Sequence, residues 1–153
     1  MNNIGVFIDA DNISAQHASA VMTHLRTIGN VSFVRSYGNW KSKTKGWKEF
    51  QNQFGVQAFH RFNLVTNKNA ADMALTVDAT ASLYGSEVFN TMVVMSSDCD
   101  FEPLVTHARS RGKYIVGCGS RQTPKPYVDQ CQAFVFMEDE KISITVMNDH
   151  VAH

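Results

Sequence analysis

Apolar and polar positions along the chain alternate between two patterns. Short, nearly continuous apolar runs are typical of strands buried on both faces of a sheet. Strands are predicted at 4–9, 31–37, 56–62, 91–97, 113–119 and 133–138. Between the strands, apolar residues recur every three or four positions, which predicts helices with one buried face. Helices are predicted at 11–29, 47–54, 70–85, 101–112 and 127–132.

Strands that alternate with helices form βαβ units, and these units predict an open, mostly parallel sheet with helices on both faces. For the first long helix, Asp11 or Asn12 is the expected cap and Gly29 the expected end. The length of 153 residues suits one domain. We expect this domain to cover 1–138, with 139–153 forming a short strand or a C-terminal extension.

Composition narrows the class of protein. The 14 basic residues balance the 14 acidic residues, so the chain does not hold nucleic acid by bulk charge, although a local basic patch is compatible with this balance. The apolar runs are far shorter than the ~20 residues of a membrane helix, and the N-terminus has no signal-peptide pattern. Cys99, Cys118 and Cys131 lack CxxC spacing and are expected to be reduced thiols. We therefore expect a cytoplasmic protein without a membrane partner.

Acidic residues follow the two most apolar strands. Asp9 and Asp11 end the first strand, and Asp98 and Asp100 follow strand 91–97. Central parallel strands bring their carboxyl ends together at the edge where ligands bind. Asp72, at the start of a helix, is a further candidate for this edge. Such carboxylates repel one another unless a cation lies among them, and Mg²⁺ or Mn²⁺ prefers oxygen ligands of this kind.

Helix capping is the alternative explanation for these acids. An Asp directly after a strand often caps the next helix. Asp11 is a good candidate for such a cap, and Asp100 can cap the helix at 101–111. For one D-x-D segment, capping is the better interpretation. Two acidic clusters after two core strands favour a metal site instead.

Three acidic motifs are similar to those of a known family. FIDADN (7–12), KNAADMALTVDA (68–79) and VVMSSDCDFEPLV (93–105) resemble, in order and spacing, the LabA-like NYN domains of the PIN-like ribonuclease superfamily. The resemblance covers about 4–138. It implies a three-layer, Rossmann-like α/β/α sandwich with a central parallel sheet. It also implies Mg²⁺- or Mn²⁺-dependent hydrolysis of RNA phosphodiester bonds.

The resemblance assigns roles to individual residues. The catalytic and metal-binding acids it implies are Asp9, Asp72, Asp98 and Asp100. Supporting roles fall to Asn12, to Ser97 beside the metal, and to Asp78, which helical geometry places on a different face from Asp72. Cys99 stands where the family more often has a small or polar residue. Because a thiol is a poor Mg²⁺ ligand, we expect the Cys99 side chain to point away from the site.

A basic, aromatic segment follows the second predicted strand. Lysines can pair with phosphates, and aromatic rings can stack on unpaired bases. Trp47, which begins a helix, is expected to pack into the core instead. The candidate RNA-binding residues are Arg35, Trp40, Lys41, Lys43, Lys45 and Lys68.

Three functions remain open from the sequence. The leading hypothesis is a metal-dependent ribonuclease whose partner is RNA. The first alternative is a phosphatase of the haloacid dehalogenase type, with Asp9 as nucleophile and Asp11 as general acid. The second is an RNA-binding or interaction module without catalysis. A homodimer with a shared groove would suit so small a nuclease. No motif in the sequence specifies the RNA substrate or distinguishes endonucleolytic from exonucleolytic cleavage.

Overall fold

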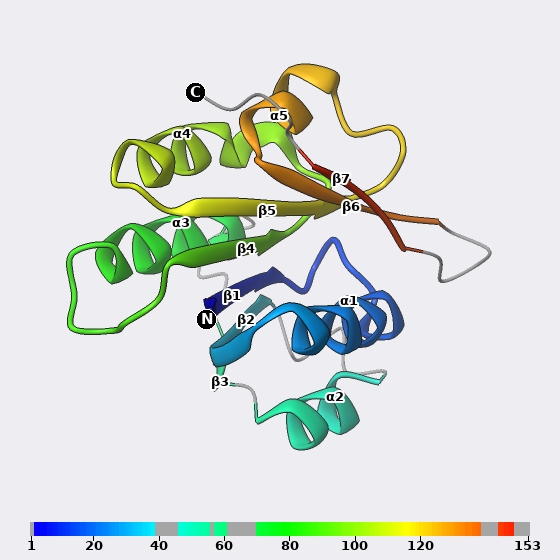
Figure 1. Cartoon of the computed structure of the whole chain (residues 1–153). Helices are drawn as coiled ribbons and strands as arrows, with labels where there is room; N and C mark the ends of the chain where they lie inside the picture. The colour runs from blue at the N-terminus through cyan, green and yellow to red at the C-terminus, as the bar shows by residue number, and fades with distance from the viewer. Residues whose placement is uncertain (1, 39–45, 56, 61–69, 139–143, 149–153) are drawn as a thin grey trace.

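The computed structural model describes residues 2–38, 46–55, 57–60, 70–138 and 144–148. A central sheet is covered by helices on both faces (Figure 1). The strands are β1 (Asn3–Asp9), β2 (Asn30–Gly38), β3 (Gln57–His60), β4 (Thr91–Met95), β5 (Tyr114–Gly119), β6 (Ala133–Met137) and β7 (Ile144–Asn148). The helices are α1 (Ala15–Ile28), α2 (Trp47–Phe54), α3 (Ala70–Ser82), the short 3₁₀ helix η1 (Cys99–Phe101), α4 (Glu102–Ser110) and α5 (Lys125–Gln130).

The sheet confirms the predicted fold class. Its strand order is β3-β2-β1-β4-β5-β6-β7. Strands β1 to β6 are parallel, and β7 pairs antiparallel with β6. The chain moves outward in one direction from β1 and in the other direction from β4. The strand order therefore reverses between β1 and β4, which is the position where open α/β sheets bind ligands.

Two apolar layers hold the helices on the sheet. In β1, Val6 and Ile8 face the layer with α1 and α2, while Phe7 faces the layer with α3, α4 and α5. All three side chains are fully buried, as expected for a central parallel strand. In α2, Trp47 packs against Phe50 with ring centroids 5.1 Å apart, so the prediction that Trp47 belongs to the core is confirmed.

Several predicted boundaries agree with the structure. Helix α2 covers the predicted 47–54 and ends at Gly55, whose positive φ of 66° suits a residue without Cβ. Gly112, with φ 82°, follows α4 in the same way. The predicted strand at 56–62 is described only over β3, and 139–153 contains the strand β7.

Other local predictions were wrong. Ser14, not Asp11 or Asn12, caps α1, because its Oγ accepts a hydrogen bond from the backbone N of His17. Asp98, not Asp100, provides the cap after β4. Helix α3 ends at Ser82 rather than at Gly85. Strand β2 continues through Gly38, the first residue of the predicted loop.

None of the helices in the described ranges combines the length and the apolar character needed to cross a lipid bilayer.

Candidate metal centre at the carboxyl edge

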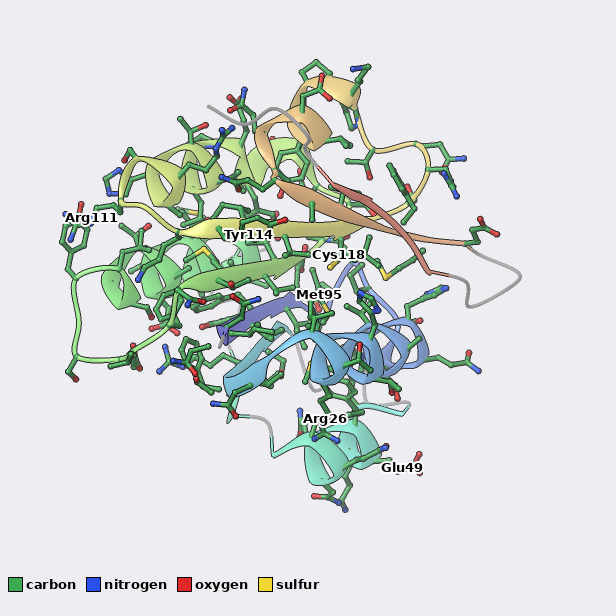
Figure 2. The ribbon with its side chains drawn as sticks, viewed as in Figure 1. Arg26, Glu49, Met95, Arg111, Tyr114 and Cys118 are labelled. Carbon is green, nitrogen blue, oxygen red and sulfur yellow. The ribbon has the colours of Figure 1, made fainter. Side chains whose placement is uncertain are left out.

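The strand pairing places three polar side chains in one row. Asp9 at the end of β1 is paired with Tyr37 of β2. Ile8 is paired with Met95 of β4, so the next residue along each strand brings Asp9 beside Ser96. Alternation along the strands points Tyr37, Asp9 and Ser96 to the face that α3 covers. Met95 and Cys118 mark the ends of β4 and β5 at this edge in Figure 2.

Asp9 is fully buried, and its two carboxylate oxygens have different surroundings. Oδ2 accepts hydrogen bonds from Asn12 Nδ2 at 2.6 Å and from Ser96 Oγ at 2.8 Å. Oδ1 accepts no hydrogen bond from a neutral side chain or a backbone N–H among the described residues; the carboxyl of Asp72 is the further group within hydrogen-bonding reach of Asp9. Burial raises the pKa of Asp9 above its ordinary value, although the bonds from Asn12, Ser96 and Asp72 oppose that rise. Oδ2 is therefore held by two neutral side chains, and Oδ1 is not.

Asp72, in the first turn of α3, lies between Asp9 and Asp98. Its carboxyl group is within hydrogen-bonding reach of both of theirs. Burial first, and then the negative charge of Asp9 and the carboxyl of Asp98, raise the pKa of Asp72 to about 8. Without a cation, Asp72 therefore keeps a proton at neutral pH, as expected for crowded acids.

The segment after β4 adds a second group of possible metal ligands. The backbone N of Asp98 donates to Ser96 Oγ at 3.1 Å, and Asp98 Oδ1 accepts from the backbone N of Asp100 at 2.9 Å. The atoms that could bind a metal, a carboxylate oxygen of Asp98, the Sγ of Cys99 and a carboxylate oxygen of Asp100, all lie within 4.8 Å of one another. The expectation that the Cys99 side chain points away from the acids was therefore wrong.

The four predicted acids thus lie around one edge. Asp9, Asp72 and Asp98 adjoin one another, and Asp100 lies beside Asp98. Asp72 and Asp100 also line a common groove of about 320 Å³. A set of adjoining carboxylates, one of them with a buried oxygen that faces only other acids, fits Mg²⁺ or Mn²⁺, which take oxygen ligands.

The predicted supporting residues lie in three different places. Asn12 binds Asp9, as described above. Ser97 Oγ accepts from the backbone N of Ser120 at 3.1 Å and so links the loops after β4 and β5. Asp78 lies further along α3, where its Oδ2 accepts a hydrogen bond from the Tyr37 hydroxyl. Tyr37 is fully buried, so this contact joins α3 to β2 in the row that contains Asp9.

The structure separates Arg35 from the acids at the edge. Its guanidinium forms an ion pair with Glu87, lies 3.7 Å from Asp78 Oδ2 and donates to Ser82 Oγ at 3.0 Å. Only 12% of the Arg35 side chain is exposed. The other candidate RNA-binding residues, Trp40, Lys41, Lys43, Lys45 and Lys68, lie outside the described residues. RNA binding by this set stays a prediction.

Ser96 and Tyr37 are candidate site residues that the sequence did not single out. Both stand beside Asp9 only because of the register between β1, β2 and β4. The resemblance singled out Ser97 instead, yet alternation along the extended chain sends Ser96 and Ser97 to opposite faces. The apolar patterns indicated the strands but carried no signal for their register.

The fold and the site together define a class of protein. It is a parallel α/β protein with carboxylates gathered where the strand order reverses. The chain belongs to the NYN domain family, whose model matches residues 3–138. This family is part of the PIN-like ribonuclease superfamily, so the resemblance drawn from the motifs is confirmed at that level. The LabA-like subtype stays a prediction.

A solved structure shows the same fold. The crystal structure of a protein of unknown function from Vibrio parahaemolyticus is similar with a TM-score of 0.71 and 16% sequence identity. The match covers 90% of this chain and 94% of that protein. At this identity, the likeness concerns the fold alone. A search of functionally curated proteins gave no match. Family membership therefore indicates a nuclease-type hydrolase without naming its substrate.

Proposed function

We propose that the protein is a metal-dependent ribonuclease that hydrolyses RNA phosphodiester bonds at the carboxyl edge of the sheet. One observation carries the proposal: the carboxyls of Asp9, Asp72 and Asp98 adjoin one another, and the buried Asp9 Oδ1 accepts no hydrogen bond among the described residues from any group other than these acids. A buried oxygen of this kind is costly unless something binds it. Membership of the NYN family supports the nuclease class.

The residues around the edge have distinct roles in this proposal. Asp9, Asp72, Asp98 and Asp100 are the metal-binding and catalytic acids. Asn12 and Ser96 hold Oδ2 of Asp9, which keeps Oδ1 directed away from them. Asp72 must release its proton before it can act as an anionic ligand. When bound, Mg²⁺ or Mn²⁺ supplies the positive charge that polarises a water molecule and the phosphate under attack.

Tyr37 and Asp78 have a supporting role. Their contact ties α3 to β2, and the first turn of α3 carries Asp72. A helix held against the sheet in this way presents Asp72 to Asp9 with little freedom. No direct contact between Asp78 and the metal is part of the proposal.

The test is a panel of single-stranded and hairpin RNAs incubated with Mg²⁺, Mn²⁺ or EDTA. We expect the wild-type protein to cleave at least one RNA with a divalent ion and none in EDTA. Asp9→Asn should lose cleavage while remaining folded. Asp129→Asn, which changes an exposed acid paired with Lys125 on α5, is the matched control and should cleave like the wild type.

Other results would contradict the proposal. Cleavage that persists in EDTA, or in folded Asp9→Asn, would remove the metal-binding role of this acid. RNA binding without cleavage under every metal condition would favour a non-catalytic module. A phosphorylated Asp9 trapped with a phosphate ester would favour the phosphatase alternative.

A further inference from the structure

A groove with apolar walls begins at the acids and lies beside α3. Met73 and Val77 stand one helical turn apart and are 60% and 69% exposed. Together they form an exposed apolar surface next to the acids. The groove is lined by Asp72, Met73, Thr76, Val77, Asp100 and Phe101. Its acidic end is therefore the candidate metal centre.

The outer end of α3 carries an aromatic and cationic cluster. Tyr84 is 57% exposed, and its hydroxyl lies 2.7 Å from Nε2 of His107 on α4. The guanidinium of Arg111 lies 4.1 Å above the Tyr84 ring. Figure 2 shows Arg111 at the outer end of the layer that contains α3 and α4. Glu87, the acid that follows closely in the chain, is ion-paired with Arg35.

The length of α3, which separates the acids from the Tyr84 cluster, suits a short length of nucleic acid. Helix α3 has 13 residues, which corresponds to about 20 Å at ~1.5 Å per residue. At the ~3.4 Å spacing of a stacked strand, this length accommodates about six nucleotides.

We propose that the groove beside α3 and the Tyr84–Arg111 cluster at the outer end of this helix together bind the single-stranded RNA that adjoins the phosphate under attack. Bases lie over Met73, Val77 and Tyr84, and Arg111 pairs with a backbone phosphate. This inference rests on the proposed function. Charge favours RNA over a protein partner, since a cation held by the acids at one end and the guanidinium of Arg111 at the other both suit a polyanion. A guanidinium stacked on a tyrosine also offers a flat surface to a base.

Binding is measured on Asp9→Asn protein with Mg²⁺, so that cleavage does not consume the probe. The probe is a fluorescent ten-nucleotide single-stranded RNA. Tyr84→Ala should raise Kd about fivefold or more, because stacking on an aromatic ring is lost. Arg111→Gln should raise Kd and reduce the slope of log Kd against log salt concentration by about 0.7.

Two matched controls keep the test specific. Arg26→Gln removes a guanidinium that lies 4.5 Å from the Phe54 ring centroid, in the opposite helix layer (Figure 2). Val88→Ser removes an exposed valine outside the groove and is compared with Val77→Ser. The controls should leave Kd and the salt slope unchanged, whereas Val77→Ser should weaken binding. Equal melting temperatures confirm that all variants are folded.

The outcomes separate this inference from the proposed function. If groove and control variants bind RNA with equal Kd while the wild-type protein cleaves RNA, the groove inference is overturned and the nuclease stands. If the groove variants lose binding but the wild-type protein never cleaves, RNA binding at this groove stands and the catalytic proposal fails. If Val77→Ser converts a dimer to a monomer in sedimentation without changing Kd, the face is an interface between copies, and the inference is overturned.

Discussion

Replacing Asp72 with Asn is expected to stabilise the cation-free protein and to weaken its response to Mg²⁺. In the folded protein, burial and the neighbouring carboxyls of Asp9 and Asp98 raise the pKa of Asp72 from 3.8 to about 8. Because the folded-state pKa is the higher one, folding takes up a proton between about pH 4 and pH 8. The free energy of unfolding therefore falls as the pH rises through this range.

The size of the effect follows from the pKa and from exposure. A pKa difference of one corresponds to ~1.4 kcal/mol, so the whole rise would correspond to roughly 6 kcal/mol in a fully buried group. Asp72 is partly exposed, and solvent screening reduces the expected gain for Asp72→Asn to about 1–3 kcal/mol at pH 8.5. Loss of a carboxylate from the first turn of α3 offsets about 0.3–1 kcal/mol of this gain.

Urea and thermal unfolding at two pH values give the measurement. At pH 5 in EDTA, Asp72 is protonated in the folded wild type but ionised in the unfolded chain, so the two proteins should differ by only about 30% of their difference at pH 8.5. At pH 8.5 in EDTA, Asp72→Asn should melt several degrees higher, at ~2–4 °C per kcal/mol. Mg²⁺ at 100 times its Kd should stabilise the wild type by ~2.7 kcal/mol and the variant by clearly less.

Two results would refute this reasoning. A variant that is less stable than the wild type at pH 8.5 in EDTA would show that the carboxyls do not repel one another. An equal Mg²⁺ shift in both proteins would show that Asp72 does not contribute to cation binding.

Two further substitutions, Ser96→Ala and Tyr37→Phe, test the surroundings of the acids, with Ser97→Ala as the control for the first. Ser96→Ala removes a hydrogen bond to the Asp9 carboxylate, so it should lower the free energy of unfolding in urea by ~1.5–3 kcal/mol and reduce the stabilisation by Mg²⁺. Ser97→Ala loses only a hydrogen bond between neutral groups, so it should lower the free energy of unfolding by ~0.5–1.5 kcal/mol and leave the stabilisation by Mg²⁺ unchanged. An equal cost and an equal Mg²⁺ shift for the two serines would contradict the assignment. Tyr37→Phe keeps the buried ring but removes the bond to Asp78, so we expect a loss of ~1.5–3 kcal/mol. It should also weaken the Mg²⁺ response, and a stability loss with an unchanged response would make Tyr37 purely structural.

The fold could be predicted from the sequence because the apolar runs, the helical periodicity and the helix-ending glycine all indicated the same elements. The apolar runs of β1 and β4 indicated strands buried on both faces, and the structure places them side by side at the centre of the sheet. Gly55 ends α2 where the helical pattern stops. These features depend on periodicity and on glycine conformation, both of which a single sequence displays.

The details of the site were less accessible because they depend on register and on turn geometry. Asp98 provides the cap after β4 because η1 begins at Cys99, two residues before the predicted helix start at 101. The same turn brings Cys99 beside its acidic neighbours. Composition offers no signal for a 3₁₀ turn of three residues. The cap was therefore predicted at Asp100 instead of Asp98, and the Cys99 side chain was predicted to point away from the acids.

Register also explains how a buried acid is maintained in this fold. Tyr37, Asp9 and Ser96 occupy adjacent positions on β2, β1 and β4, and α3 lies over that row with Asp78 at Tyr37 and Asp72 at Asp9. The Tyr37–Asp78 contact fixes α3, and Ser96 with Asn12 fixes one oxygen of Asp9. The same packing of α3 on this row therefore orients the Asp9 carboxylate and buries its second oxygen, Oδ1. Removing any one of these contacts should weaken cation binding before it disrupts the sheet, since the apolar layers do not depend on them.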